Sequence, residues 1–425
     1  MSTTTDFDTV DFFREKSIYQ DPYGYYEYLR SHGPVWREPH RGIVMVTGFE
    51  EATAVYNDAA TFSSCNTVAG PFTPFPVPLE GDDISDIIEE YRDQLPFSDQ
   101  LPSFDPPHHT EQRGLLMRLI TPKRLKENEE FMWRLADQQI DEFHGTGKCE
   151  FINEYAGPFT LLVVADLLGV PEEDHESFRQ ELQVDRVPTR GQDGKMAHKP
   201  LAFLYKRFTA YIEDRRREPR DDVMTELATA TLPDGSLPPV DDVMRISANL
   251  FAAGQETTAR MLGTALRLIG EQPELQQRLR DDREVIPRFI EECVRTESPL
   301  QAQFRLARVA AKIGDVDVAP GTSVLLLPGA ANRDPRQFDH PAEFRLDRQN
   351  GRQHLGFGFG IHACAGAPLA RAEGRVSVLR LLDRMADIEV SEAEHGPPDA
   401  RRYDYTPIYL MRGLEGLHLE FTPVA

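Results

Sequence analysis

The residue best suited to chemistry is Cys364, which lies in the glycine-rich stretch Phe-Gly-Phe-Gly-Ile-His-Ala-Cys-Ala-Gly at 357–366. Glycines let a backbone turn tightly and approach a flat ligand closely. The stretch leads into a predicted helix at 367–385, whose positive N-terminal end favours a thiolate over a thiol. Backbone N–H groups beyond the cysteine are placed to donate to its sulfur. The sequence therefore favours a thiolate at Cys364.

Three interpretations of this loop are possible. A single thiolate suits axial ligation of haem iron, where its electron density promotes O–O cleavage. A lone cysteine is more commonly a small buried hydrophobic residue. The third interpretation is a dinucleotide-binding fingerprint, because Gly358-x-Gly360-x-x-Ala363 matches it and Asp383 follows 20 residues later. That fingerprint must follow a buried strand, and the polar residues 350–354 do not form one, so it is disfavoured.

The remaining cysteines, Cys65, Cys149 and Cys293, lie far apart and form no Cys-x-x-Cys pair. This spacing excludes a zinc knuckle, a ferredoxin cluster and a disulfide framework.

Composition narrows the class of protein. The 425 residues carry a net charge of −23, which argues against a nucleic-acid partner. With 40% hydrophobic and 28% charged residues, the chain is globular rather than disordered. The N-terminus lacks an export signal, and the longest apolar stretch, 159–170, contains Asp166 and is shorter than the ~20 residues of a membrane helix. We expect a cytoplasmic protein with no membrane partner.

The N-terminal hundred residues mix helix and strand signals, and the rest is mainly helical. Apolar runs at 35–36 and 43–46 predict a hairpin in a small sheet. Residues 66–104 are rich in proline and acidic residues, which predicts a long loop that is either functional or a surface insertion. Other patterns predict helices at 21–31, 50–57, 122–143, 159–168, 172–182, 200–217 and 281–297, and strands at 309–318 and 323–327.

The longest predicted element is a helix over 242–270, with Asp242 as its N-cap. No repeat or break in composition divides the chain, so we expect one mainly helical domain. The apolar residues of the long helix on helical spacing are Ile246, Leu250, Phe251, Met261, Ala265 and Leu268.

The motif Phe357-Gly-x-Gly-x-His362-x-Cys364-x-Gly366 resembles the haem-binding signature of the cytochrome P-450 family, in its soluble bacterial form. The resemblance extends in the correct order over about residues 20–420. It implies the mainly α, triangular fold of haem-thiolate monooxygenases, with small β-sheets and the haem between the long central helix and the cysteine loop. It also implies a single domain over 1–425, with an N-terminal extension at 1–20 and a substrate-access loop at 66–104.

The resemblance assigns roles at the reacting centre. Cys364 would ligate the iron of haem b, with Phe357 and Gly358 beside the cofactor. Residues 253–258, Ala-Gly-Gln-Glu-Thr-Thr, resemble the oxygen-activation motif. There Glu256 and Thr257 would order water and relay protons, as general acid catalysis requires. Gly254 would leave room for a diatomic ligand.

Further residues match contacts to the haem propionates and a structural network. His109 and Arg113, one helical turn apart, would face the propionates, with His108 as the rival of His109. Arg305 and His362 match two further contacts. Glu292-x-x-Arg295 resembles the family's structural ion pair, whose third partner would be Arg345 or Arg348.

The implied reaction inserts one oxygen atom from O2 into a small to medium hydrophobic molecule, such as a terpenoid, steroid or aromatic compound. Hydroxylation and oxidative O-demethylation are both compatible with it. No flavin or nicotinamide site is expected, so electrons would come from a ferredoxin with its NAD(P)H-dependent reductase. The predicted docking cations are Arg371, Arg375, Lys123, Arg124 and Lys126, and the predicted substrate-pocket residues are Leu250, Ala253, Leu300, Phe304 and Ile408.

Two alternatives to this function remain open. One is a peroxide-driven haem-thiolate peroxygenase, against which the Glu256-Thr257 pair argues. The other is a non-catalytic haem sensor or carrier, which would not need a proton relay.

Overall fold

The structure is a computed structural model that describes residues 7–184, 201–232 and 235–424. Residues 1–6 of the predicted extension and Pro200 of a predicted helix lie outside the described residues. The chain groups into two compact units. Unit 1 comprises Met1–Leu95, Glu291–Ala363 and Tyr403–Glu415, and unit 2 comprises Pro96–Ile290, Cys364–Arg402 and Gly416–Ala425. One domain over 1–425 stays a prediction.

Unit 1 contains a five-stranded sheet in the order β1-β2-β8-β5-β3. β1 (Val35–Arg37) and β2 (Val44–Val46) form the predicted hairpin, with Val35 opposite Val46. β2 then pairs in parallel with β8 (Ser323–Leu326), which brings a distant part of the chain into this sheet. The remaining strands, both antiparallel to their neighbours, are β5 (Gln303–Ala307) and β3 (Phe62–Ser63).

The helices of unit 1 pack their apolar faces around this sheet. A cluster of buried residues, including Tyr25, Tyr26, Phe304 and Tyr409, joins helix α2 to β5 and the C-terminal segment. The β6–β7 hairpin divides the predicted strand 309–318, because Gly314 supplies a positive φ of 55° at the turn. The elements are α1 (Lys16–Gln20), α2 (Tyr23–Ser31), α3 (Phe49–Asn57), α4 (Ser85–Tyr91), α14 (Pro328–Ala331), β6 (Ala311–Ile313) and β7 (Val316–Val318).

The predicted loop at 66–104 is more ordered than its composition indicated. It contains helix α4 and short 3₁₀ turns at Gly70–Phe72, Arg92–Gln94 and Leu101–Ser103. Ile84 and Ile88 are fully buried in a small cluster with Cys65, Leu95 and Leu306. The prediction of an uninterrupted loop was wrong here, because two isoleucines spaced by one helical turn anchor α4 despite the acidic residues around them.

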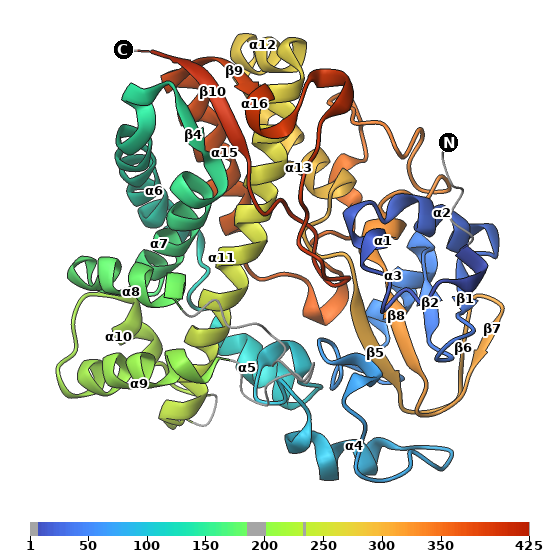
Figure 1. The fold of residues 1–425 in the computed structure, drawn as a ribbon. Coiled ribbons are helices and arrows are strands. Elements are labelled where there is room, and N and C mark those ends of the chain that lie inside the picture. The colour runs from blue at the N-terminus through green and yellow to red at the C-terminus, as the bar shows by residue number, and fades with distance from the viewer. Residues whose placement is uncertain (1–6, 185–200, 233–234, 425) are drawn as a thin grey trace. The chain divides into compact units, whose positions relative to one another are not determined.

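Unit 2 is built around α11 (Val240–Glu271), whose 32 residues extend over roughly 48 Å at ~1.5 Å per residue. Figure 1 shows α11 running through this unit, flanked by α7, α9 and α15. All six apolar residues expected on its inner face are buried. The other helices are α5 (His108–Leu116), α6 (Pro122–Phe143), α7 (Gly157–Leu167), α8 (Glu172–Val184), α9 (Ala202–Arg217), α10 (Val223–Ala228), α12 (Pro273–Asp281), α15 (Ala367–Arg384) and α16 (Glu392–His395).

A three-stranded antiparallel sheet completes unit 2, with β10 (His418–Pro423) between β4 (Lys148–Glu150) and β9 (Met385–Val390). A π-helical turn at Ile152–Ala156 follows β4 and leads into α7. α13 (Ile286–Thr296) crosses from unit 2 to unit 1.

Two helix boundaries differ from the predictions. α11 begins at Val240, so Asp242 lies in its first turn rather than at its N-cap, where Pro239 stands. The helix predicted at 281–297 begins only at Ile286, because Asp281 ends α12 and Asp282 caps a short 3₁₀ turn between the two helices.

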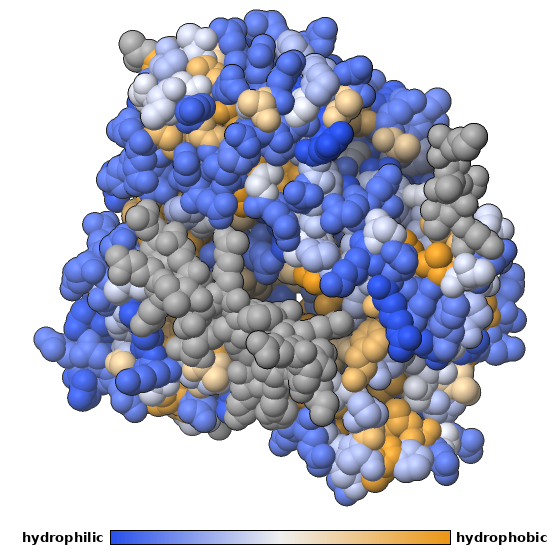
Figure 2. Space-filling view, in the orientation of Figure 1, coloured by the Kyte–Doolittle hydropathy of each residue, from blue (hydrophilic) through white to orange (hydrophobic). Residues whose placement is uncertain are grey.

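The face shown in Figure 2 is mainly hydrophilic, with small scattered apolar patches. Among the described residues, no helix is both long and apolar enough to cross a membrane.

Candidate haem-thiolate site

Glycines shape the loop that precedes Cys364. Gly358 and Gly360 both have φ of +67°, a left-handed conformation that other residues rarely adopt. At Gly360 a Cβ atom would lie only 2.4 Å from the carbonyl oxygen of Tyr56, so this glycine also lets the loop pack on α3. The backbone therefore needs the glycines that the motif supplies.

In unit 2, Cys364 stands just before α15 and has solvent-accessible surface. Its thiol is nevertheless closely surrounded, and this burial raises the thiol pKa. Backbone N–H groups of Gly366 and Ala367, together with the charges of Arg113 and Arg371, act in the opposite direction. The expected backbone N–H donors are present, but burial has the larger effect on the thiol pKa. A bond to a metal ion would therefore be needed to keep Cys364 a thiolate at neutral pH.

Helix α5 presents His109 and Arg113 on one face, as their spacing predicted. His109 is 2% exposed whereas His108 is exposed, which favours His109 as the inward-facing histidine. Burial lowers the pKa of His109, and the neighbouring Arg113 lowers it further. Burial also lowers the pKa of Arg113, while the Cys364 side chain raises it. Arg113 is therefore within electrostatic reach of the cysteine.

The segment 253–258 lies midway along α11. The hydroxyl of Thr257 donates to the Ala253 carbonyl at 2.8 Å, and the Glu256 carboxylate pairs with Arg260 one turn along. Gly254 was expected to leave room for a diatomic ligand, but the structure shows another need for glycine at this position. An added Cβ would lie 2.8 Å from the Val164 side chain on α7. This glycine permits close packing of α11 against α7.

Arg305 and His362 belong to unit 1, and both contact the segment after β3. The guanidinium of Arg305 donates to Thr67 Oγ1 at 3.0 Å, and Nε2 of His362 lies 3.0 Å from Ser64 Oγ. Arg305 is 3% exposed and lies over the Tyr56 ring. Sequence reasoning missed Ser64 and Thr67, since two hydroxyl residues in a loop carry no recognisable pattern.

The predicted pocket residues divide between the units. Leu250 is buried on α11 and Ala253 is exposed on it. Leu300 and Ile408 are half-buried in unit 1, whereas Phe304 is fully buried among aromatic rings, 6.1 Å from that of Phe72. Phe357 in unit 1 is half-buried and lies 5.5 Å, ring to ring, from His354. Their roles toward a substrate or cofactor stay predictions.

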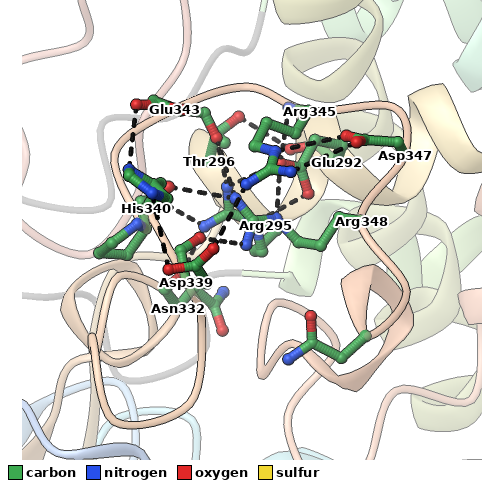
Figure 3. Close-up of polar contacts among 12 residues, drawn as sticks. Glu292, Arg295, Thr296, Asn332, Asp339, His340, Glu343, Arg345, Asp347 and Arg348 are labelled. Atoms are coloured by element: carbon green, nitrogen blue, oxygen red, sulfur yellow. Dashed lines mark hydrogen bonds and ion pairs between the residues drawn. The ribbon is translucent and has the colours of Figure 1, made fainter.

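A buried charge network ties α13 to the segment before the cysteine loop (Figure 3). Arg295 donates to both carboxylate oxygens of Glu292, at 2.8 and 2.7 Å. The sequence left the third partner open between Arg345 and Arg348. Arg348 is that partner, because its Nε lies 3.1 Å from the Glu292 carboxylate. Arg345 contributes only its backbone N–H to Glu292 and directs its side chain to Asp347. Burial acts to raise the pKa of Glu292, but the guanidinium groups of Arg295 and Arg348 and the backbone N–H of Arg345 together lower it. These contacts join α13 to the segment before the cysteine loop.

The donors in unit 2 fit haem b. The Cys364 side chain belongs to an exposed residue and receives the backbone N–H groups of Gly366 and Ala367. Arg113 supplies a nearby cation of the kind that carboxylates bind. In unit 1, the hydroxyl groups of Thr67 and Ser64 contact Arg305 and His362, the two further side chains that the resemblance assigns to the propionates.

Known proteins agree with this assignment. The Cytochrome P450 family model matches residues 185–398. Cytochrome P450 144 of Mycobacterium tuberculosis is 32% identical, over 97% of this chain and 91% of that protein. The substrate-free structure of Mycobacterium marinum cytochrome P450 CYP150A6 is 54% identical with a TM-score of 0.93, over 99% of this chain and 100% of that one. CYP109E1 from Bacillus megaterium, in complex with testosterone, is 25% identical with a TM-score of 0.76, over 94% and 99% of the two chains.

The mainly α fold with small sheets predicted from the sequence is confirmed by these neighbours. Haem b and O2 are the cofactor and cosubstrate that the family uses. The chain belongs to the cytochrome P450 family and is a haem-thiolate monooxygenase.

Proposed function

We propose that this monooxygenase oxidises a small to medium hydrophobic molecule of the terpenoid, steroid or aromatic class, by hydroxylation or oxidative O-demethylation. The observation that carries the proposal is Cys364 just before α15, within electrostatic reach of Arg113 and in the same unit as the Glu256-Thr257 segment of α11. The residues assigned to the substrate, Leu250, Ala253, Leu300, Phe304 and Ile408, are all apolar. The complex of CYP109E1 with testosterone supports a substrate of this size and polarity.

When bound, haem b supplies the activation of O2. In this proposal, Cys364 would ligate the iron of haem b, Phe357 and Gly358 would border the cofactor, and His109, Arg113, Arg305 and His362 would bind its propionates. Opposite charges in a site of low dielectric attract strongly, so the cations would fix the orientation of the cofactor.

The Glu256 and Thr257 side chains manage protons in this proposal. The Thr257 hydroxyl already donates to the Ala253 carbonyl and keeps its lone pairs for accepting a hydrogen bond from water. Glu256 is more than half exposed, which allows it to exchange protons with solvent once it leaves Arg260. Gly254 would keep α11 close to α7 at this point.

Electrons would come from a ferredoxin and its NAD(P)H-dependent reductase, as separate proteins. The cations proposed for docking are partly neutralised within unit 2. Arg375 pairs with Glu129 at 2.5 Å, and Arg124 pairs with Glu226 at 2.6 Å. Electrostatic attraction of the ferredoxin to this surface would therefore be moderate. Shape complementarity of the two surfaces would contribute more to the affinity between the two proteins.

Titration of the ferric holoprotein with a panel of terpenes, steroids, fatty acids and methoxyaromatics tests the substrate class. We expect at least one terpene, steroid or methoxyaromatic compound to shift the haem absorption band in a saturable way. Ala253→Phe would weaken that shift, because the larger ring occupies the proposed pocket. A response to fatty acids alone, or to none of the four classes, would contradict the proposal.

A further inference from the structure

His354 is a buried histidine that stands just before the cysteine loop. Its side chain is 1% exposed, and both ring nitrogens have partners within unit 1. Nδ1 accepts a hydrogen bond from the backbone N–H of Gly356 at 3.1 Å, and Nε2 lies 3.0 Å from the Glu291 carboxylate. A ring nitrogen that accepts carries no proton, so the proton lies on Nε2, which donates to Glu291. The imidazole therefore connects the start of the loop to α13.

Glu291 has partners that differ from those of the adjacent Glu292. It is 4% exposed, and its second carboxylate oxygen lies 3.6 Å from the guanidinium of Arg352, whose side chain is 74% exposed. Glu292 instead belongs to the charge network of Figure 3. A carboxylate that accepts from one ring nitrogen fixes which nitrogen carries the proton and how the ring is oriented. Glu291 therefore holds His354 in the orientation that offers Nδ1 to the loop.

The backbone around Gly356 has little freedom to find another arrangement. The N–H of Leu355 donates to Oδ1 of Asn332 at 2.6 Å. At Gly356 an added Cβ would lie 2.5 Å from the Val294 side chain on α13. His354 supplies the acceptor for the Gly356 N–H between these contacts. Since a backbone donor is costly to leave without a partner, the imidazole is needed at this turn.

The same imidazole contacts the aromatic residue that the proposed function assigns to the border of the cofactor. The ring centroids of His354 and Phe357 are 5.5 Å apart, and the ring planes meet at 43°. Ring pairs at this separation attract each other. Phe357 is half-buried, so this contact is one of those that set the position of its ring. A change at His354 would therefore disturb both the backbone before Phe357 and the Phe357 ring.

We propose that His354 is a positioning residue of the haem site, held by Glu291 and acting through Phe357. The inference rests on the proposed place of Phe357 beside haem b. Apolar groups around a metal site restrict water and lower the local dielectric, which influences the reduction potential of the metal. Reduction adds a negative charge to a thiolate-bound iron centre, and water stabilises added charge. Displacement of Phe357 should therefore raise the reduction potential of the holoprotein.

A potentiometric titration of the substrate-free holoprotein, followed by haem absorbance, tests this role without turnover. Two substitutions divide the contacts of His354. In His354→Asn the short amide can still accept from the Gly356 N–H, because asparagine side chains commonly bind the backbone two residues on, but it cannot reach Glu291. In His354→Gln the longer amide can reach Glu291 as Nε2 does, but it places no acceptor where Nδ1 meets the Gly356 N–H.

The two variants should differ in the size of their effect. We expect His354→Gln to raise the equilibrium constant for reduction roughly tenfold, at the lower end of the ~10–100-fold by which loss of an outer contact changes metal affinity or activity. For one electron, tenfold corresponds to about 59 mV. His354→Asn should give a smaller rise, because the Gly356 N–H keeps its acceptor. An unchanged potential in both variants would overturn the proposal.

A double-mutant cycle with Phe357→Ala tests whether the effect passes through the Phe357 ring. Phe357→Ala should raise the potential by itself. Adding His354→Gln to it should cause no further rise, because the effects of two groups that act as a unit are not additive. Additive shifts would show that His354 acts by another route and would overturn the proposal. If His354→Gln does not retain haem, His354→Asn takes its place in the cycle with the same expectation.

His395→Gln is the matched control, since His395 is also a buried histidine with both ring nitrogens bonded. It is 7% exposed, its Nδ1 lies 3.0 Å from the Arg402 carbonyl oxygen, and its Nε2 accepts from the His418 backbone N–H at 2.9 Å. This variant should lower the free energy of unfolding but leave the reduction potential at the wild-type value. A rise in potential equal to that of His354→Gln would assign the effect to general loosening of the fold and would contradict the positioning role.

The outcomes separate this role from the proposed function. An unchanged potential in Phe357→Ala would count against the proposed place of Phe357 beside the cofactor, and the role of His354 would be overturned with it. A raised potential in Phe357→Ala with an unchanged one in both His354 variants would overturn the positioning role alone. Absence of product with every compound of the panel would count against the proposed function, while the potentials would still decide the role of His354.

Discussion

Replacing Cys364 by serine is expected to abolish the thiolate-type absorption spectrum of the holoprotein and its monooxygenase activity. A serine hydroxyl is far less acidic than a thiol and a much poorer electron donor, so it cannot replace the thiolate at iron. The loop should keep its shape, because its turns depend on Gly358 and Gly360 and not on the sulfur. The expected result is a folded protein that binds haem weakly, measured by absorbance and by haem content after gel filtration.

Cys149→Ala provides the matched control. Cys149 is 5% exposed in β4, and burial raises the pKa of its thiol, which keeps it protonated and inert. This variant should retain both the spectrum and the activity of the wild type. A thiolate-type spectrum in Cys364→Ser would show that another residue ligates the iron.

Replacing Arg295 by alanine is expected to have the largest effect on stability. The guanidinium is 0% exposed and donates to Glu292 and to the carbonyl groups of Asn332, Pro341 and Glu343. Its removal leaves the Glu292 carboxylate and the three carbonyl groups without this donor. Removing one partner of a buried ion pair typically lowers the free energy of unfolding by ~3–5 kcal/mol. That is a large fraction of a typical unfolding free energy of ~5–15 kcal/mol. Urea unfolding of the holoprotein measures it.

Arg345→Ala is the control for this prediction, because Arg345 is 33% exposed and directs its side chain to the exposed Asp347 and Asp339. We expect it to cost less than ~1 kcal/mol, as for other surface pairs. An equal loss of unfolding free energy in Arg295→Ala and Arg345→Ala would contradict the assignment of Arg348, rather than Arg345, to the buried network.

The same network sets a direction for the pH dependence of stability. The folded-state pKa of Glu292 lies below its ordinary value, so the unfolded chain binds the proton more readily. The stabilisation from Glu292 is therefore complete above the usual glutamate range and is lost as the pH falls through the folded-state pKa.

Local patterns predicted much of the fold. Apolar spacing identified the inner face of α11, and Pro122 after Thr121 marked the start of α6, where the Thr121 hydroxyl accepts from the Arg124 backbone at 3.3 Å. The 66–104 segment was misjudged because its order depends on packing of Ile84 and Ile88 against β5, which lies far away in sequence. Tertiary contacts of this kind leave no periodic signal.

For the candidate site too, the sequence carries local motifs but does not show contacts between distant segments. The cysteine loop and the α5 pair are short motifs, so the resemblance to the family could assign them roles, which stay predictions. Ser64 and Thr67 contact His362 and Arg305 from a distant segment, which only the structure shows. The packing of Gly254 against Val164 likewise depends on how α7 meets α11.

Turnover under ¹⁸O2 in unlabelled water tests the central claim most directly. With a compound from the titration, a ferredoxin, its reductase and NAD(P)H, mass spectrometry of the product is the measurement. We predict one ¹⁸O atom per product molecule for hydroxylation and, for O-demethylation, one in the released formaldehyde, measured before it exchanges with water. Product without ¹⁸O, or product formed equally well from unlabelled H2O2 without the ferredoxin, would contradict a monooxygenase that takes its oxygen atom from O2.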